Sequence, residues 1–216
     1  MSLPWSAAAR DGALQQPLSV IAVSDPFLRR RLRKARRQLN RREQQEHARA
    51  VASRFVRCGF GHAARRIALY IPTGGELDPW PLVERLHRNR RWYLPVLRGH
   101  AHGRLWFVRH RPGEPLRPNR YGIPEPARRN RQILPTHSLD LVLVPLVGFD
   151  HDCHRIGMGA GFYDRSLAFL SSRRYWQRPR LVGLAHECQR VDRIEPKPWD
   201  VPLDAVITEA SVYRRR

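Results

Sequence analysis

Lysine is nearly absent from this sequence, although the chain is strongly basic. Of the 40 Lys and Arg residues among 216, only Lys34 and Lys197 are lysines, and with 19 Asp and Glu the formal net charge is +21. A surface of this sign attracts anions such as nucleotides, polyglutamates or nucleic acid. The arginines scatter along the chain and cluster only at residues 29–42. This distribution favours solvated surface positions for most of them.

Cysteine and long apolar runs are also scarce. Cys58, Cys153 and Cys188 lie far apart and form no C-x-x-C pair. This pattern argues against a disulfide framework and a structural zinc site, and it favours a reducing compartment. No run of about 18 apolar residues is present, and Pro4 and Asp11 interrupt any secretory signal. We therefore expect a cytoplasmic protein with no membrane partner.

Apolar periodicity divides the chain into alternating helices and strands. Helical spacing predicts helices over residues 27–39, over 41–57 after a capping box of Asn40 and Glu43, and from Pro79 to about Arg90. Short apolar runs predict strands at 66–71, 92–97, 105–108, 139–145, 181–185 and 203–208. The alternation predicts an α/β fold with a mostly parallel sheet flanked by helices.

The domain organisation follows from the same pattern. Residues 1–23 lack periodicity and are expected to form a flexible N-terminal tail. Residues 24–216 are long enough for one domain with its own core. Within it, residues 109–138 are rich in Pro, Gly and Arg and are expected to form a long irregular excursion.

A glycine-rich segment, residues 155–165, follows an apolar strand and precedes a predicted helix. Its alternate glycines allow positive φ, so that backbone N–H groups and the helix N-terminus can converge on phosphate oxygens. Arg155 adds a cation, and Asp164 adds a carboxylate suited to Mg²⁺. The segment is not a Walker loop, because no Gly-Lys-Ser/Thr follows. A tight turn that only packs strand on helix is the alternative.

Other polar residues occupy strand ends and turns. Glu76 follows a predicted strand, where α/β sheets bind ligands, and it could hold a substrate or cap the next helix. Asp200 could be a second metal carboxylate or a turn residue. The cluster at residues 151–154 is an unfavourable metal site, because no second cluster completes it. Cys188 near His186 has no orienting partner that would make it a nucleophile.

Taken in order, these segments resemble the 5-formyltetrahydrofolate cyclo-ligases, also called methenyltetrahydrofolate synthetases. The resemblance covers about residue 24 to the C-terminus and is specific as an ordered set. It is carried by residues 75–78, 94–96, 143–150, 155–165, 183–187, 198–203 and 206–208, and by the basic first helix.

The resemblance implies both a fold and a reaction. The fold would be like that of sugar-phosphate isomerases and CoA transferases. The reaction would convert 5-formyltetrahydrofolate and ATP, with Mg²⁺, into 5,10-methenyltetrahydrofolate, ADP and phosphate. The substrate could carry a polyglutamate tail, and the protein would act as a monomer without a specific nucleic-acid partner.

The resemblance also implies roles for individual residues. Arg155 and Tyr163 would be catalytic, Ile71, Glu76 and Tyr121 would contact the folate, and Asp164 and Asp200 would hold Mg²⁺. The residues implied to bind ATP are Arg29, Arg33, Arg155, Ile156, Gly157, Met158, Gly159, Ala160, Gly161, Phe162 and Tyr163.

Two positions depart from the family pattern. A lysine expected four residues before Arg29 is Asp25 here, and a lysine that many members carry in the glycine loop is Ala160. We hypothesise that Asp25 caps the first helix and that Arg33 supplies the second phosphate cation. The alternatives are a basic nucleic-acid-binding protein, which the charge would suit, and a family relative with altered activity.

Overall fold

The computed structural model describes residues 21–22, 25–86, 89–97, 103–119, 122–126, 133–172 and 177–215. Its helices are α1 (Pro26–Gln38), α2 (Arg41–Arg57), α3 (Trp80–Leu86) and α4 (Phe162–Leu167), with 3-10 turns η1 (Thr136–Ser138), η2 (Ala168–Ser172) and η3 (Glu187–Gln189). Its strands are β1 (Ile21–Ala22), β2 (Arg66–Ala68), β3 (Arg91–Leu97), β4 (Leu105–His110), β5 (Leu116–Pro118), β6 (Pro124–Pro126), β7 (Ile133–Leu134), β8 (Leu141–Pro145), β9 (Gly148–Phe149), β10 (Arg155–Ile156), β11 (Arg180–Leu184), β12 (Ile194–Glu195), β13 (Ala205–Ile207) and β14 (Val212–Arg214).

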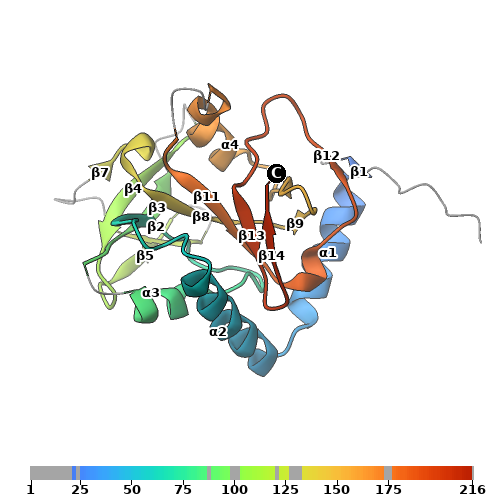
Figure 1. The fold of residues 1–216 in the computed structure, drawn as a ribbon, viewed down its shortest axis with the longest axis horizontal. Helices are drawn as coiled ribbons and strands as arrows, with labels where there is room; N and C mark the ends of the chain where they lie inside the picture. Colours follow the sequence, from blue (N-terminus) through green and yellow to red (C-terminus); the bar gives the residue numbers. More distant parts are fainter. Residues whose placement is uncertain are drawn as a thin grey trace, which may run out of the picture.

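An eight-stranded sheet in the order β14-β13-β11-β8-β2-β3-β4-β7 forms the centre of the molecule (Figure 1). The inner strands β13, β11, β8, β2 and β3 run parallel to one another, and β14, β4 and β7 pair antiparallel at the edges. This confirms the predicted mostly parallel sheet with flanking helices, whereas the likeness to sugar-phosphate isomerases stays a prediction. After β3 the chain returns to the other side of β2 to form β8, so the strand order reverses between β2 and β8.

Helices cover both faces of this sheet, with α2 and α3 on one side and α4 on the other (Figure 1). Strand β8 divides its side chains between them: Leu141 and Leu143 join the cluster under α2 and α3, whereas Val142 and Val144 join the cluster under α4. All four are almost fully buried. The continuous apolar run therefore reflects burial on both faces, as expected for a central parallel strand.

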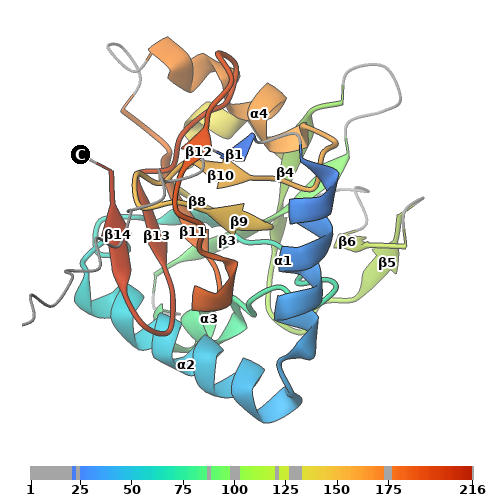
Figure 2. The same ribbon diagram turned by 90° about the vertical axis from the view of Figure 1, so that its right-hand side faces the viewer.

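Helix α1 stands at one end of the sheet and packs on the short β9–β10 ladder (Figure 2). Asp25 caps it as predicted, because its side chain accepts hydrogen bonds from the N–H groups of Phe27 (2.8 Å) and Leu28 (3.2 Å). Phe27, the first residue of the predicted helix, is 78% exposed. The buried stripe instead runs through Leu28, Leu32 and Arg36, which are each four residues apart.

The other differences from the sequence predictions are local. Helix α2 and its capping box are confirmed at the predicted bounds, but α4 has only 6 residues before η2 continues it. The expected irregular excursion contains β5, β6, β7 and η1. Of the expected tail, Ile21–Ala22 pair with β12, and residues 1–20 lie outside the described residues.

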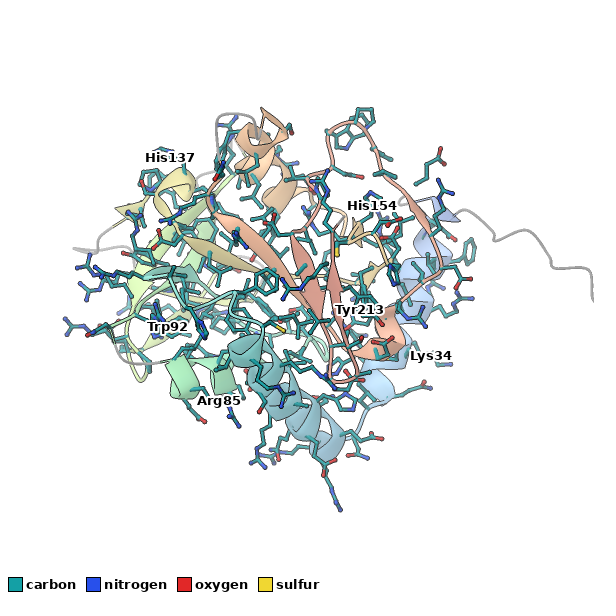
Figure 3. The ribbon with its side chains drawn as sticks, in the orientation of Figure 1. Lys34, Arg85, Trp92, His137, His154 and Tyr213 are labelled. Carbon is teal, nitrogen blue, oxygen red and sulfur yellow. The ribbon has the colours of Figure 1, made fainter. Side chains whose placement is uncertain are left out.

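Lys34 of α1 and Arg85 of α3 are exposed and project away from the sheet in Figure 3. This arrangement agrees with solvated positions for much of the positive charge. Among the described helices, none is both long and apolar enough to span a bilayer.

Candidate active site

A cavity of about 520 Å³ opens at the carboxyl edge of the parallel strands. The chain segments that follow β2 and end β3 and β8 contribute Ile71, Leu97 and Pro145 to its wall. It therefore lies where the strand order reverses, which is the usual ligand position in open α/β sheets. The remaining wall comes from α1, the β5–β6 region, the glycine loop and the segment after β12. Its polar and glycine-loop residues are Arg29, Tyr70, Thr73, Glu76, Asn119, Glu125, Arg155, Gly157, Met158, Gly159, Ala160, Gly161, Phe162, Tyr163, Asp164, Lys197, Trp199 and Asp200.

The glycine loop presents main chain to this cavity. A Cβ added to Gly157 or Gly159 would meet no atom within 4 Å, so the lack of a side chain there keeps space open. Gly159 has φ +103° and Gly161 has φ +64°, conformations that side-chain-bearing residues rarely adopt. Because α4 is short, the loop's own backbone is the main source of convergent dipoles, with a smaller part for the helix than expected.

Arg155 lies beneath this loop and is 7% exposed. Its guanidinium donates to the carbonyl of Val201 and forms an ion pair with the Asp164 carboxylate. Burial lowers the pKa of Arg155, while the nearby carboxylates of Asp164 and Asp200 raise it. A guanidinium stays charged in proteins, so the cavity floor carries one fixed cation between two carboxylates.

Glu76 and Tyr163 face the same cavity. The Glu76 side chain is 7% exposed, and its Oε2 accepts a hydrogen bond from the Thr73 N–H (3.0 Å). Burial raises the pKa of Glu76 above its ordinary value. Burial also raises the pKa of the Tyr163 phenol, and the Glu76 carboxylate raises it further.

The Tyr163 hydroxyl is the one polar group of this pair that lacks a partner. It is buried and has no hydrogen-bond partner within the part of the chain that the structure describes. An orphaned buried hydroxyl is costly unless a ligand completes its hydrogen bond. The cavity wall therefore includes a neutral hydrogen-bond donor that has no acceptor among the described residues.

Comparison with known proteins places these features in a family. The profile of the 5-formyltetrahydrofolate cyclo-ligase family matches residues 21–209. The chain belongs to this family. It is 40% identical to 5-formyltetrahydrofolate cyclo-ligase of Escherichia coli K12 over 84% of this chain and 98% of the relative, and 36% identical to that of Haemophilus influenzae over 82% and 92%.

Two solved structures agree with the fold. The NMR structure of Aquifex aeolicus 5,10-methenyltetrahydrofolate synthetase is 29% identical with a TM-score of 0.72, covering 88% of this chain and 92% of its own. The synthetase from Mycoplasma pneumoniae is 22% identical with a TM-score of 0.64, covering 85% and 97%, and it supports the fold alone.

Most residues that the cyclo-ligase resemblance singled out meet in this one cavity. Arg29, Ile71, Glu76, Arg155, Asp200 and residues 157–164 all line it. Ile156 does not, because its side chain packs with Leu28 and Leu32 in the core under α1. Arg33 does not line the cavity, but its charge is close enough to Glu76 to oppose the rise in the Glu76 pKa that burial causes. Tyr121 lies outside the described residues.

Several lining residues were not predicted from the sequence. Trp199 is 64% exposed at the cavity, and the Lys197 Nζ lies 5.5 Å from its ring centroid. Asn119 directly follows β5, and Glu125 lies in the middle of β6. The position of Trp199 within the 198–203 motif could have predicted its place in the site. The other residues reach the site through long-range packing, which leaves no local pattern in the sequence.

Arg36 was also not predicted. It does not line the cavity, but it contacts the loops that form the cavity wall. The residue is 1% exposed, and its guanidinium donates to the carbonyls of Gly74 (3.1 Å) and Leu146 (3.0 Å). Its Nη2 lies 3.5 Å from Oε1 of Glu76. The signal was available in the sequence, because Arg36 continues the four-residue spacing of Leu28 and Leu32.

We expect Arg36→Met to lower the free energy of unfolding by on the order of 3 kcal/mol, because it leaves the buried Glu76 carboxylate and the buried Leu146 carbonyl without their cation. Urea unfolding followed by circular dichroism measures this change. Arg42→Met is the matched control, since that guanidinium is 87% exposed in its pair with Glu46. Equal unfolding midpoints for the two variants would contradict the structural role of Arg36.

Proposed function

We propose that this chain catalyses the ATP-dependent cyclisation of 5-formyltetrahydrofolate to 5,10-methenyltetrahydrofolate, with release of ADP and phosphate. The observation that carries the proposal is a single cavity in which a glycine loop with a buried arginine faces a buried glutamate and an unpartnered tyrosine. One half suits a polyphosphate and the other suits a hydrogen-bonding heterocycle. The family and both full-length bacterial relatives support this activity.

The reaction needs ATP because a formamide is a poor electrophile whose oxygen is a poor leaving group. The formyl oxygen attacks the γ-phosphorus, the bond to the ADP oxygen breaks, and the formyl carbon becomes strongly electrophilic. N10 then bonds to that carbon, the carbon–oxygen bond breaks with loss of phosphate, and N10 loses its proton. The protein chiefly has to align the two substrates and balance the moving charge.

In this proposal the phosphates lie along the glycine loop. The main chain of residues 157–161 and the side chains of Arg29 and Arg155 face the triphosphate. Arg33 is the proposed second cation of α1, acting from outside the cavity wall. The absence of a side chain at Gly157 and Gly159 is what lets phosphate oxygens approach the backbone closely.

The folate lies toward the loop that follows β2. Glu76 hydrogen-bonds the pterin ring and Ile71 packs on it. Tyr121, which lies outside the described residues, keeps the folate contact that the resemblance implies. Tyr163 lines the same cavity as Glu76 and Arg155, and its buried hydroxyl has no hydrogen-bond partner among the described residues. In this proposal its O–H donates to the formyl oxygen and to the charge that develops there as phosphate is transferred.

Asp164 and Asp200 fit a magnesium ion, which prefers oxygen ligands. Each is engaged through one oxygen: Oδ1 of Asp164 contacts Arg155, and Oδ2 of Asp200 accepts from the Lys197 N–H (2.9 Å). Neither of these two contacts uses the other carboxylate oxygen, so Oδ2 of Asp164 and Oδ1 of Asp200 remain for the ion. Bound there, the ion would neutralise charge on the nucleotide phosphates, while Arg155 holds Asp164 in place.

The same proposal covers location, assembly and substrate range. The chain acts in the cytoplasm as a monomer and accepts folates with or without a polyglutamate tail. The exposed basic residues near α1 supply charge complementary to that tail. None of the described cavity residues favours the nucleic-acid alternative.

The proposed reaction is tested by mixing purified protein with 5-formyltetrahydrofolate, ATP and Mg²⁺ and following the methenyl chromophore. Product should form only when both nucleotide and divalent ion are present, because each supplies a part of phosphoryl transfer that the protein lacks. Turnover that persists after chelation and desalting would exclude activation by ATP.

The folate assignment is tested with Glu76→Ala. We expect the KM for 5-formyltetrahydrofolate to rise roughly 10- to 100-fold, as for a lost hydrogen bond to a charged group, with the KM for ATP nearly unchanged. Asp78→Ala is the matched control, because Asp78 lies in the same loop but caps Trp80 (2.9 Å) and does not line the cavity. A larger rise in the KM for ATP than for folate would place Glu76 on the nucleotide side.

A further inference from the structure

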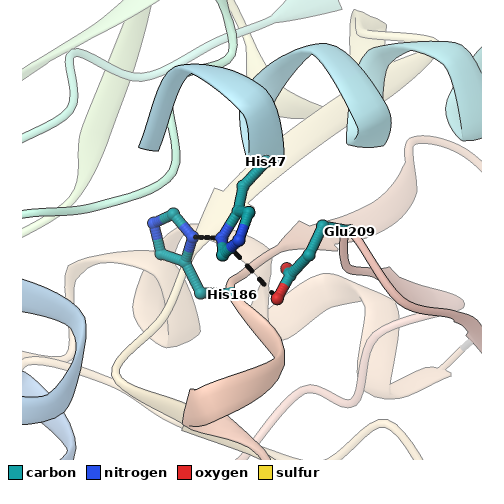
Figure 4. A group of neighbouring side chains, drawn as sticks. All are labelled: His47, His186 and Glu209. Carbon is teal, nitrogen blue, oxygen red and sulfur yellow. Dashed lines mark hydrogen bonds and ion pairs between the residues drawn. The ribbon is translucent and has the colours of Figure 1, made fainter. Parts of the chain in front are cut away.

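Two imidazoles and a carboxylate meet outside the active-site cavity (Figure 4). His47 comes from α2, His186 immediately precedes η3, and Glu209 follows β13. The two Nδ1 atoms are 2.9 Å apart, and Nδ1 of His47 is 3.6 Å from Oε1 of Glu209. One ligand atom from each residue lies within 4.8 Å of the others. Three good metal donors thus converge from three separate elements.

The geometry of His186 suits a ligand. The residue is fully buried, and its Nδ1 lies 2.9 Å from Nδ1 of His47 in a hydrogen bond. Its Nε2 is also buried and has no hydrogen-bond partner among the described residues. A metal ion that enters between the two rings replaces the proton that their Nδ1 atoms share, because an imidazole nitrogen binds metal through its lone pair.

The carboxylate is held in position by its surroundings. Both oxygens of Glu209 accept from the N–H of Glu187 (3.1 Å each), and the Glu209 carbonyl accepts from Arg54 (3.0 and 2.9 Å). The side chains of His47 and Glu209 are 22% and 19% exposed. The cluster is thus preorganised by its neighbours yet open to solvent on one side, which leaves room for an entering ion and a water ligand.

A second trio, Asp150, Asp152 and His154, lies close together as well but is explained by hydrogen bonds alone. Oδ1 of Asp150 accepts from the N–H groups of Asp152 (3.0 Å) and His154 (2.9 Å). Its Oδ2 accepts from the Ile194 N–H (2.9 Å) and lies 2.9 Å from Nδ1 of His154. This carboxylate is engaged through both oxygens and shapes a turn.

We propose that His47, His186 and Glu209 bind a divalent transition-metal ion of the zinc type, with water as the fourth ligand. Two imidazole nitrogens and one carboxylate oxygen suit a four-coordinate zinc site, whereas Mg²⁺ prefers a shell of oxygens. The ion links α2, η3 and the turn between β13 and β14. It acts there as a clamp on the fold, separate from the ion that accompanies ATP.

The test measures zinc binding by metal-free full-length protein. Chelator-treated and desalted protein competes with a chromophoric chelator for Zn²⁺, and calorimetry records Tm with and without the ion. We expect one zinc per chain and a raised Tm in the unaltered protein. His47→Gln should weaken binding about 10-fold or more and remove the rise in Tm, because it deletes a partly exposed ligand without opening the core.

Three control variants separate this site from others. His154→Gln removes a partly exposed imidazole, Cys188→Ala removes the thiol nearest in sequence to His186, and Asp200→Asn removes a carboxylate on the nucleotide side. Each variant should bind zinc like the unaltered protein. His47→Gln should also keep cyclo-ligase turnover. Unaltered zinc affinity in His47→Gln, or loss of binding only in Asp200→Asn or Cys188→Ala, would overturn the proposal.

Discussion

The buried guanidinium of Arg36 is the contact on which the active site depends. It joins α1 to the loop after β2 through the Gly74 carbonyl and Glu76, and to the corner after β8 through the Leu146 carbonyl. These two segments flank the point where the strand order reverses, so one side chain joins both of them. Four acceptors around one desolvated cation, with the Thr73 carbonyl (3.5 Å) as the fourth, offset the cost of its burial and hold Glu76 in place.

The charges within the cavity follow from that framework. Burial keeps the phenol of Tyr163 protonated and raises the pKa of Glu76, while Arg155 retains its charge between Asp164 and Asp200. The cavity thus combines a cation suited to phosphate, a neutral phenol donor and a carboxyl group, which are the three kinds of group that the proposed reaction uses.

The sequence predicted the helices and strands better than it predicted which distant residues would come into contact. Helix α2 and the strands of the parallel centre followed from periodicity and capping, because those signals are local. The glycine loop and Glu76 were found by residue type at strand ends. Arg36 was missed because a charged residue on a basic helix is read as solvated, and only its spacing from Leu32 signalled burial. The pairing of His47 with His186 spans 139 residues, and such contacts leave no local pattern.

The central claim is that the formyl oxygen itself receives the phosphoryl group, and isotope transfer tests it most directly. 5-Formyltetrahydrofolate labelled with ¹⁸O in the formyl group would be converted with ATP and Mg²⁺ in unlabelled water, and the released phosphate analysed by mass spectrometry. The account predicts one ¹⁸O atom in each phosphate formed. Unlabelled phosphate, with the label released to water, would show that ATP hydrolysis and ring closure are not joined through this oxygen.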